Sequence, residues 1–498
     1  MTSSSMCCNA QARFVGGGLL ALTGLVMSGC AVTPEPLTEA AMQAQAEGDV
    51  GRLTLDQVMI VEPVDLYEAM ARALTYNLDL RVELMNETLS GAQLELAKLA
   101  MLPQLVGELD YTARNKFNAA SSQSFRGGGQ SLEPSFSSNR DVLTGDLRLS
   151  WNILDFGVSY YRAKQASDQT LIAQEQTQRV LNRILEDVRT AYWRAVSNER
   201  LQHRMDALMT DVEQALGEMG RVERRKLRSP LVTLTAQREL LGIKRELLQL
   251  RRNLQLGKLQ LAALMNVKPG QAFTVATPSK LPEPRVIDAD QADLERQALL
   301  WRPELRENVL RKRINAHETR AALLELLPGI ELNVGVGYSN NSFLENNNWL
   351  SIGANVAGNL LDLVRYPARK RELAARDALL DTEGLALSMA VLTQVNVSLA
   401  QYRHAQEEYH NAEVYSDTQL ALTDVVRSRE QTRRVSRQTL IREEMNALVA
   451  EVQRDVAFAD MENGYAAVQA SIGARPLPEA LPDASIDELA QALREHWQ

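Results

Sequence analysis

Apolar residues recur at every seventh position in the stretch that ends near residue 266. One row consists of Leu240, Leu247, Leu254 and Leu261, and a second lies three residues further on, at Ile243, Leu250 and Leu264, with Gly257 as its one gap. Heptad spacing predicts a helix whose apolar seam packs against a partner helix in a left-handed supercoil. The nearest partner is the proline-free stretch 157–229, which would be about 100 Å long as a helix. The two helices would meet at a turn at Ser229-Pro230.

The same pattern occurs a second time along the chain. Residues 366–436 again form a long stretch, with a proline only at Pro367. Heptads there fall on Leu385, Leu392 and Leu399, and those of the following helix on Met445, Val452 and Ala459. Three separations are equal in the two copies: Asp155 to Ser229 and Asp362 to Ser436, Ser229 to Asn266 and Ser436 to Gly473, and Leu80 to Pro103 and Leu305 to Pro328. Together they indicate an internal duplication.

Four segments alternate apolar and polar residues with period two, which predicts strands at about 104–114, 142–153, 330–338 and 349–357. In the second segment Leu147 lies on the apolar face and Asp146 on the polar face. Such strands suit a barrel wall between lipid and water, or a half-exposed hairpin of a soluble protein. Aromatic residues at the segment ends suit an interfacial girdle; they are Trp151, Phe156, Tyr338, Phe343 and Trp349.

Residues 1–29 resemble an export signal, with one charge and an apolar run too short to span a bilayer. The sequence Met27-Ser28-Gly29-Cys30 resembles a lipoprotein cleavage site, which predicts lipidation of Cys30; an ordinary signal peptide with an incidental cysteine is the alternative. Cleavage would remove Cys7 and Cys8, so no disulfide is expected. No apolar run after residue 30 is expected to form a transmembrane helix, so any membrane crossing would use strands.

The pattern divides the rest of the chain into five parts. We expect a spacer at 30–64, a first repeat at 65–267, a proline-rich linker at 268–290, a second repeat at 291–474 and a tail at 475–498. The tail ends in an amphipathic helix, which we expect to pack against the outside of the helical body.

Composition narrows the possible functions. The 498 residues are 5% aromatic and 23% charged, which suits long exposed helices, and the net charge of −9 argues against a nucleic-acid partner. The five histidines have no metal-ligand spacing, and no phosphate loop or nucleophile elbow is present. We therefore expect no catalytic residue, no metal and no cofactor.

Several short motifs resemble those of the TolC-like outer-membrane efflux protein family. They are Asp65-Leu66-Tyr67-Glu68-Ala69, Asn77-Leu78-Asp79-Leu80, Leu102-Pro103, Leu154-Asp155-Phe156-Gly157, Arg302-Pro303-Glu304-Leu305, Leu327-Pro328 and Leu361-Asp362-Leu363. The resemblance covers about 65–473.

The resemblance implies an α-dominated membrane protein with four transmembrane strands per subunit and long antiparallel coiled-coil hairpins. A homotrimer would form a 12-stranded β-barrel and a 12-helix α-barrel. The implied function is a lipid-anchored, passive exit duct in the outer membrane of a Gram-negative bacterium. Its partners would be a periplasmic adaptor and an inner-membrane pump, either proton-driven or ABC type. A lipid-anchored periplasmic coiled-coil adaptor or structural protein is the alternative.

The two helical turns are the candidate tips. Residues expected to contact the adaptor are Ser229, Pro230, Leu231, Val232, Ser436, Arg437, Gln438 and Thr439. Residues expected near the pore constriction are Thr235, Arg437, Arg442, Glu443 and Glu444. Around a trimer axis like charges repel, so we expect acids there to pair with arginines of a neighbouring subunit; a solvated helix face is the alternative. The family's glycine-led turn and its acidic residue are replaced here by Pro230 and Ala236, so its aperture residues do not transfer one by one.

Overall fold

The computed structural model describes residues 36–53, 57–130, 133–225, 229–268, 270–278, 281–287, 289–475 and 484–497. The chain divides into two units, residues 1–57 and 58–498. In the first unit, α2 (Glu39–Leu53) has no buried side chain. The predicted signal at 1–29 and Cys30 lie outside the described residues.

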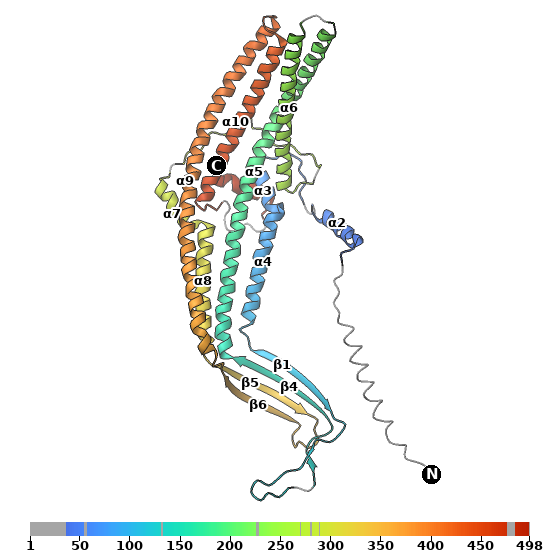
Figure 1. The fold of residues 1–498 in the computed structure, drawn as a ribbon, viewed down its shortest axis with the longest axis vertical. Helices are drawn as coiled ribbons and strands as arrows, with labels where there is room; N and C mark the ends of the chain where they lie inside the picture. The colour runs from blue at the N-terminus through green and yellow to red at the C-terminus, as the bar shows by residue number, and fades with distance from the viewer. Residues whose placement is uncertain are drawn as a thin grey trace, which may run out of the picture. The chain divides into compact units, whose positions relative to one another are not determined.

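Helices make up most of the described part of the second unit, where they form two sets of four followed by one more (Figure 1). The first set is α3 (Leu66–Tyr76), α4 (Leu78–Leu99), α5 (Ile153–Arg224) and α6 (Pro230–Leu264). The second set is α7 (Gln291–Trp301), α8 (Pro303–Leu324), α9 (Asp362–Gln431) and α10 (Arg437–Ser471), and α11 (Ile486–Trp497) follows. The long helices α5 and α9 pack against α4 and α8 on the strand side and against α6 and α10 on the side of the turns.

Equivalent positions of the two sets share their backbone conformation. Asn77 joins α3 to α4 with φ −64° and ψ 126°, and Arg302 joins α7 to α8 with φ −63° and ψ 128°. After α6 and α10 the chain turns through residues of positive φ, Asn266 at 54° and Gly473 at 75°. This agreement supports the internal duplication that the equal spacings indicate.

The heptad pattern of α6 matches the packing, and that of α9 matches it at Leu399 but not at Leu385. Leu240, Leu247, Leu254 and Leu261 are all buried. Leu385, which we expected in the seam of α9, is 74% exposed, and the buried row contains Val391, Val395 and Tyr402 instead. The heptad assignment of α9 is therefore wrong at Leu385, because the face that packs on α8 and α10 is a different one.

The four alternating segments are strands of one antiparallel sheet in the order β1-β4-β5-β6. They are β1 (Gln104–Ala113), β4 (Asp141–Asn152), β5 (Gly329–Ser339) and β6 (Asn348–Ala357). The pairing of β4 with β5 joins the two copies of the repeat. Two short strands, β2 (Ala119–Ala120) and β3 (Ser135–Phe136), pair within the loop between β1 and β4.

The end of the predicted spacer and part of the predicted linker pack within the second unit. Val64 is buried and forms a parallel bridge with Val275, and the hydroxyl of Tyr192 donates to the carbonyl of Ala276 at 3.0 Å. The tail helix α11 packs on α3, as expected, and buries Leu493 and Trp497.

One described helix, α9, is long and apolar enough to cross a bilayer by length and composition, with a mean hydropathy of 1.2 over 18 residues. The expectation that no such run follows residue 30 is therefore wrong. Only 22% of that window is buried, and a single helix of this kind is weak evidence for a membrane span.

Candidate functional site

The register of the sheet places side chains of like polarity on the same face. Residues directly opposite each other in antiparallel strands share a face. Leu147 lies opposite both Gly107 and Val336, and Val336 lies opposite Leu350. The apolar face thus continues across all four strands, and its members are exposed in the subunit; examples are Leu105, Leu109, Leu149, Leu332, Val334, Ile352 and Val356.

The opposite face is polar and carries several charges. Asp146 lies opposite Glu108, and Arg148 lies 3.3 Å from the Asp146 carboxylate. Trp349 also lies on this face, against Gly337: a Cβ on Gly337 would be 2.5 Å from the indole ring. The expected place of Trp349 in an interfacial girdle is therefore wrong, because its neighbour Leu350 occupies the apolar face.

Both lateral edges of the second unit lack partners within the part of the chain that the structure describes. Strands β1 and β6 are each paired on one side only, so the sheet is open and one chain forms no closed barrel. On the helical side, α4 exposes an apolar stripe of Val82, Met85, Leu89 and Leu96. At the other edge α9 exposes Leu385 and Met389.

The start of α6, at the first of the two tips, presents apolar side chains to solvent. Pro230 occupies the first turn of α6, where its missing N–H costs nothing. Leu231 is 75% exposed, Val232 is exposed as well, and Thr235 lies on the same exposed side of the seam. Ala236, by contrast, is buried in the seam. Sequence reasoning placed Leu231 and Val232 together at this tip, and the structure has both on one exposed helical turn.

The second turn is tied to the first hairpin by polar contacts. The Ser436 hydroxyl caps α10 by accepting from the Thr439 N–H at 3.1 Å. Arg437 donates to Asp211 of α5 at 2.7 Å, and Gln438 donates to Glu239 of α6 at 2.8 Å. Arg442 also donates to Glu239, at 3.2 Å. We call the three contacts that Arg437, Gln438 and Arg442 make with α5 and α6 the tip latch.

The acidic residues of the second turn also find partners inside the subunit. Glu444 accepts from Arg427 of α9 at 3.1 Å. Burial alone would raise the pKa of Glu443, but hydrogen bonds from Gln419, Asn446 and Arg442 outweigh it and hold that pKa below its usual value. Within the single chain each of these acids thus has an arginine partner, and pairing with a neighbouring subunit stays a prediction.

Ion pairs between α5 and α8 join the two copies, and no pattern in the sequence predicts them. Buried carboxylates of Asp168, Glu175 and Glu307 pair with arginines across the contact between α5 and α8; Arg306 lies 2.6 Å from Glu175 and Arg179 lies 2.7 Å from Glu307. The partners are more than a hundred residues apart, so no local pattern marks them.

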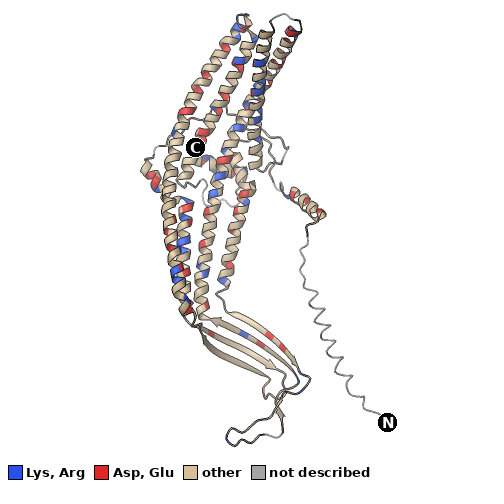
Figure 2. Cartoon of the chain, in the orientation of Figure 1, with Lys and Arg blue, Asp and Glu red and all other residues tan. Residues whose placement is uncertain are grey.

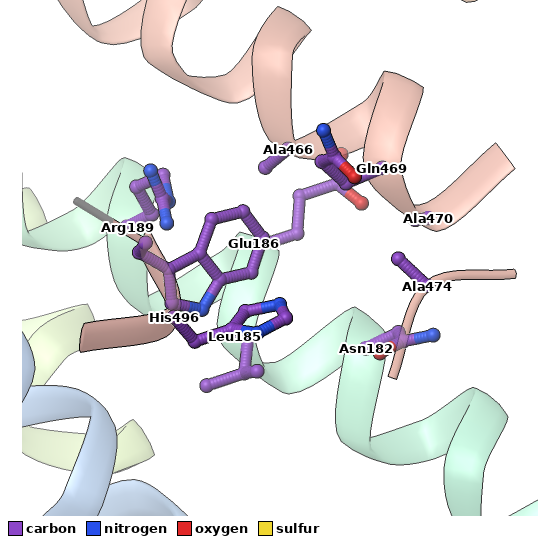
Figure 3. A pocket seen from close by; sticks show the side chains of 10 residues that line it. Asn182, Leu185, Glu186, Arg189, Ala466, Gln469, Ala470, Ala474 and His496 are labelled. Atoms are coloured by element: carbon purple, nitrogen blue, oxygen red, sulfur yellow. The ribbon is translucent and has the colours of Figure 1, made fainter. Parts of the chain in front are cut away.

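A buried arginine fixes α11 at the middle of the helical body. Arg189 and Glu462 pair at 3.1 Å with side chains only 1% and 3% exposed. The Arg189 guanidinium also lies 4.4 Å from the centre of the Trp497 ring. Burial lowers the pKa of Arg189, and the charge of Glu462 opposes that shift. Beside them is a cavity with room for about one water molecule, lined by α5, α10 and the chain's C-terminal segment (Figure 3).

Ionisable residues elsewhere are spread out. Figure 2 shows acidic and basic residues interspersed along the helices and sparse on the strands. Among the described residues, no group of three His, Cys, Asp or Glu side chains is arranged to hold a metal ion.

Comparison with known proteins gives matches of structure alone. No protein-family model and no curated protein matches the sequence. The structure is similar to the outer-membrane channel OprN, with a TM-score of 0.62 and 16% identity over 89% of this chain and 99% of that one. It is similar to the Campylobacter jejuni CmeC outer-membrane channel, with a TM-score of 0.65 and 12% identity over 87% and 89% of the two chains.

It is also similar to the outer-membrane protein VceC of Vibrio cholerae, with a TM-score of 0.60 and 16% identity over 82% and 96%. In each pair nearly the whole of both chains aligns. The described part of this chain therefore has the fold of the TolC-like outer-membrane channels.

Proposed function

We propose that this protein is the outer-membrane exit duct of a tripartite export system. The observation that carries the proposal is the apolar face that runs in register across four strands with open edges. Such a sheet suits contact with lipid on one side and water on the other. Solved structures of the same fold are described as outer-membrane channels, which supports the same reading.

Closure of the sheet requires other copies of the chain. An open strand edge in lipid leaves backbone N–H and C=O groups without partners, at a cost of several kcal/mol each. Three chains would pair each β1 with the β6 of a neighbour and form a 12-stranded barrel. This arrangement removes both edges from every subunit.

The helical part supports the same symmetry. At each level the subunit has four long helices, so three subunits would give a 12-helix tunnel. The exposed stripe Val82–Met85–Leu89–Leu96 of α4 would then meet Leu385 and Met389 of the neighbouring α9. Burial of these side chains between subunits would explain why Leu385 lies outside the subunit's own seam.

The helical turns lie farthest from the sheet (Figure 1), so in this arrangement they would point toward the pump. The exposed Leu231 and Val232 and the capped turn Ser436–Thr439 would contact the periplasmic adaptor. An inner-membrane pump, proton-driven or ABC type, would supply the energy, and the duct itself would conduct passively.

Lipid attachment at Cys30 is a further part of the proposal and rests on the sequence alone. Replacing Cys30 with Ser should abolish incorporation of labelled palmitate and slow removal of the signal. The barrel would still insert through trimer closure, so we expect a reduced yield rather than complete loss. Unchanged labelling would place the anchor elsewhere.

Conductance in planar bilayers tests the proposal directly. The purified protein should produce discrete, long-lived current steps without any added pump. The alternative, a periplasmic adaptor or structural coiled-coil protein, has no path through the membrane. Absence of current steps from protein that is folded and lipid-associated would favour that alternative.

A further inference from the structure

The loop that joins strands β1 and β4 is basic, although the protein as a whole is acidic. Residues 114–140 contain four basic residues and one acidic residue, whereas the whole chain has a net charge of −9. Arg114, Lys116, Arg126 and Arg140 are all exposed. Within the described ranges, none of these four makes an ion pair. Arg140 lies over the Phe117 ring, so Arg114, Lys116 and Arg126 are the three basic residues considered for a partner outside the chain.

The base of this loop is held firmly. Phe117 stacks on Phe136 with ring centres 4.3 Å apart, and Phe136 meets Phe343 of the second outer loop edge-on at 5.4 Å. The side-chain amide of Asn341 donates to the carbonyl of Ser137 at 3.1 Å and accepts from the N–H of Asn139 at 3.1 Å. Arg140 lies over the Phe117 ring at 5.1 Å, so its side chain belongs to this base.

Beyond the base, the loop tip presents an aromatic and a basic residue side by side. The tip is a turn in which the Ser124 N–H donates to the Gly129 carbonyl at 2.7 Å and Gly128 has a φ of +63°. Phe125 is fully exposed there, with Arg126 next to it. A fully exposed phenylalanine makes no contribution to packing in the subunit, so a partner that takes up apolar surface would explain it.

The position of the loop indicates which partner this is. The loop leaves the sheet at the end opposite to the helices (Figure 1). If the helices are periplasmic, as the proposed function requires, the loop lies at the outer surface, where the apolar face of the sheet meets lipid headgroups. Aromatic and basic side chains together suit that boundary, because rings enter the acyl region while cations bind phosphate.

We propose that this loop binds the phosphorylated headgroups of the lipids around the channel in the outer leaflet. Arg114, Lys116 and Arg126 bind phosphate oxygens, and an arginine can do so through two parallel hydrogen bonds. Phe125 inserts beside the acyl chains. The contacts at the base hold the two ends of the loop together, which lowers the entropic cost of ordering the loop on lipid. The inference rests on the proposed function only for the outward direction of the loop.

The test uses the full-length protein in mild detergent, titrated with lipid A that carries two phosphates. Replacement of Arg114, Lys116 and Arg126 together by glutamine should weaken binding at least about tenfold, since each basic residue near a phosphorylated surface contributes several-fold. A matched control replaces Arg238, Arg245 and Arg252 by glutamine; these are three exposed arginines on α6, and their loss should leave the affinity unchanged. Raising the salt concentration should weaken the wild type and leave the triple loop variant little affected.

A second measurement compares two forms of lipid A on the wild type alone, so its result does not depend on whether the variants fold. Lipid A without phosphates should bind at least about tenfold more weakly than the form with two. Equal affinity for both lipids, or equal affinity of wild type and triple loop variant, would overturn the inference. So would unchanged lipid binding combined with raised conductance of the loop variant, which would mean that the loop covers the pore mouth. In all these outcomes a conducting trimer would keep the proposed function intact, and its absence would remove that function.

Discussion

Gly257 lies where α6 packs tightly against Arg194 of α5. A Cβ at this position would lie 2.6 Å from the Cβ of Arg194, closer than two such atoms approach. Gly242 lies earlier on α6, and a Cβ added there would have no atom within 4 Å. The single gap in the heptad row is therefore a contact between two helices, and the two glycines form a matched pair for testing it.

We predict opposite effects of alanine at the two glycines. Gly257→Ala should destabilise the protein by about 1–3 kcal/mol, because the helices must separate to admit the methyl group. Gly242→Ala should stabilise it by about 0.5–1 kcal/mol through its helix propensity. The thermal unfolding midpoints of the two variants, compared with wild type, measure both effects. A rise in both midpoints would contradict the packing described for Gly257.

At the scale of single residues, the sequence predicted what local spacing determines. Leu240 and Leu261 are buried as the heptads require. Trp349 and Leu385 were misplaced, because the face that a residue occupies depends on register and on which neighbours pack against it. The partner of Gly257 is likewise absent from any local pattern, since Arg194 belongs to another helix.

Among the elements, β4 offers the sharpest test of the two faces. Leu147→Arg should cost about 2–4 kcal/mol if that side chain faces the middle of the bilayer. Asp146→Arg places the same side chain on the polar face of the same strand, beside Arg148, and should cost much less. The yield of folded, membrane-inserted protein compares the two variants. A Leu147→Arg variant no worse than Asp146→Arg would mean that the faces are assigned the wrong way round.

The contacts of the tip latch predict how the helical end of the channel opens. Arg437 and Arg442 join α10 to the hairpin of α5 and α6, so the double change Arg437→Ala with Arg442→Ala should let the two hairpins separate at the tips. Single-channel conductance in planar bilayers should rise. Arg427→Ala is the matched control, because Arg427 pairs with Asp424 and Glu444 inside the α9–α10 hairpin and does not join the two hairpins. Wild-type conductance in the double variant would place the constriction elsewhere.

The strands and helices were predictable from the sequence because their apolar residues recur with different periods. Alternation at period two marks β1, β4, β5 and β6, and heptads mark α6. The partners of the tip residues were not predictable, since Asp211 is more than two hundred residues from Arg437 in the sequence. Residues 57–64 and 268–290 also show no period, yet Val64 and Val275 pair, because the helices around them leave space for an extended segment.

On the scale of the whole molecule, duplication explains both the order and the incompleteness of the subunit. Each copy contributes one β-hairpin and one long helical hairpin, and the pairing of β4 with β5 and the ion pairs between α5 and α8 join them. The same arrangement leaves β1, β6, α4 and α9 exposed at the two edges. The proposed trimer would cover these apolar edges and pair the free sides of β1 and β6.

The mass of the purified protein in mild detergent tests this claim most directly. We predict a particle of three chains, because three subunits would pair each β1 with a neighbouring β6 and bury the stripes of α4 and α9. Charged substitutions in the α4 stripe, such as Met85→Glu, should shift the mass toward smaller species. A well-folded single chain, stable at wild-type sequence, would contradict the shared barrel and with it the exit duct.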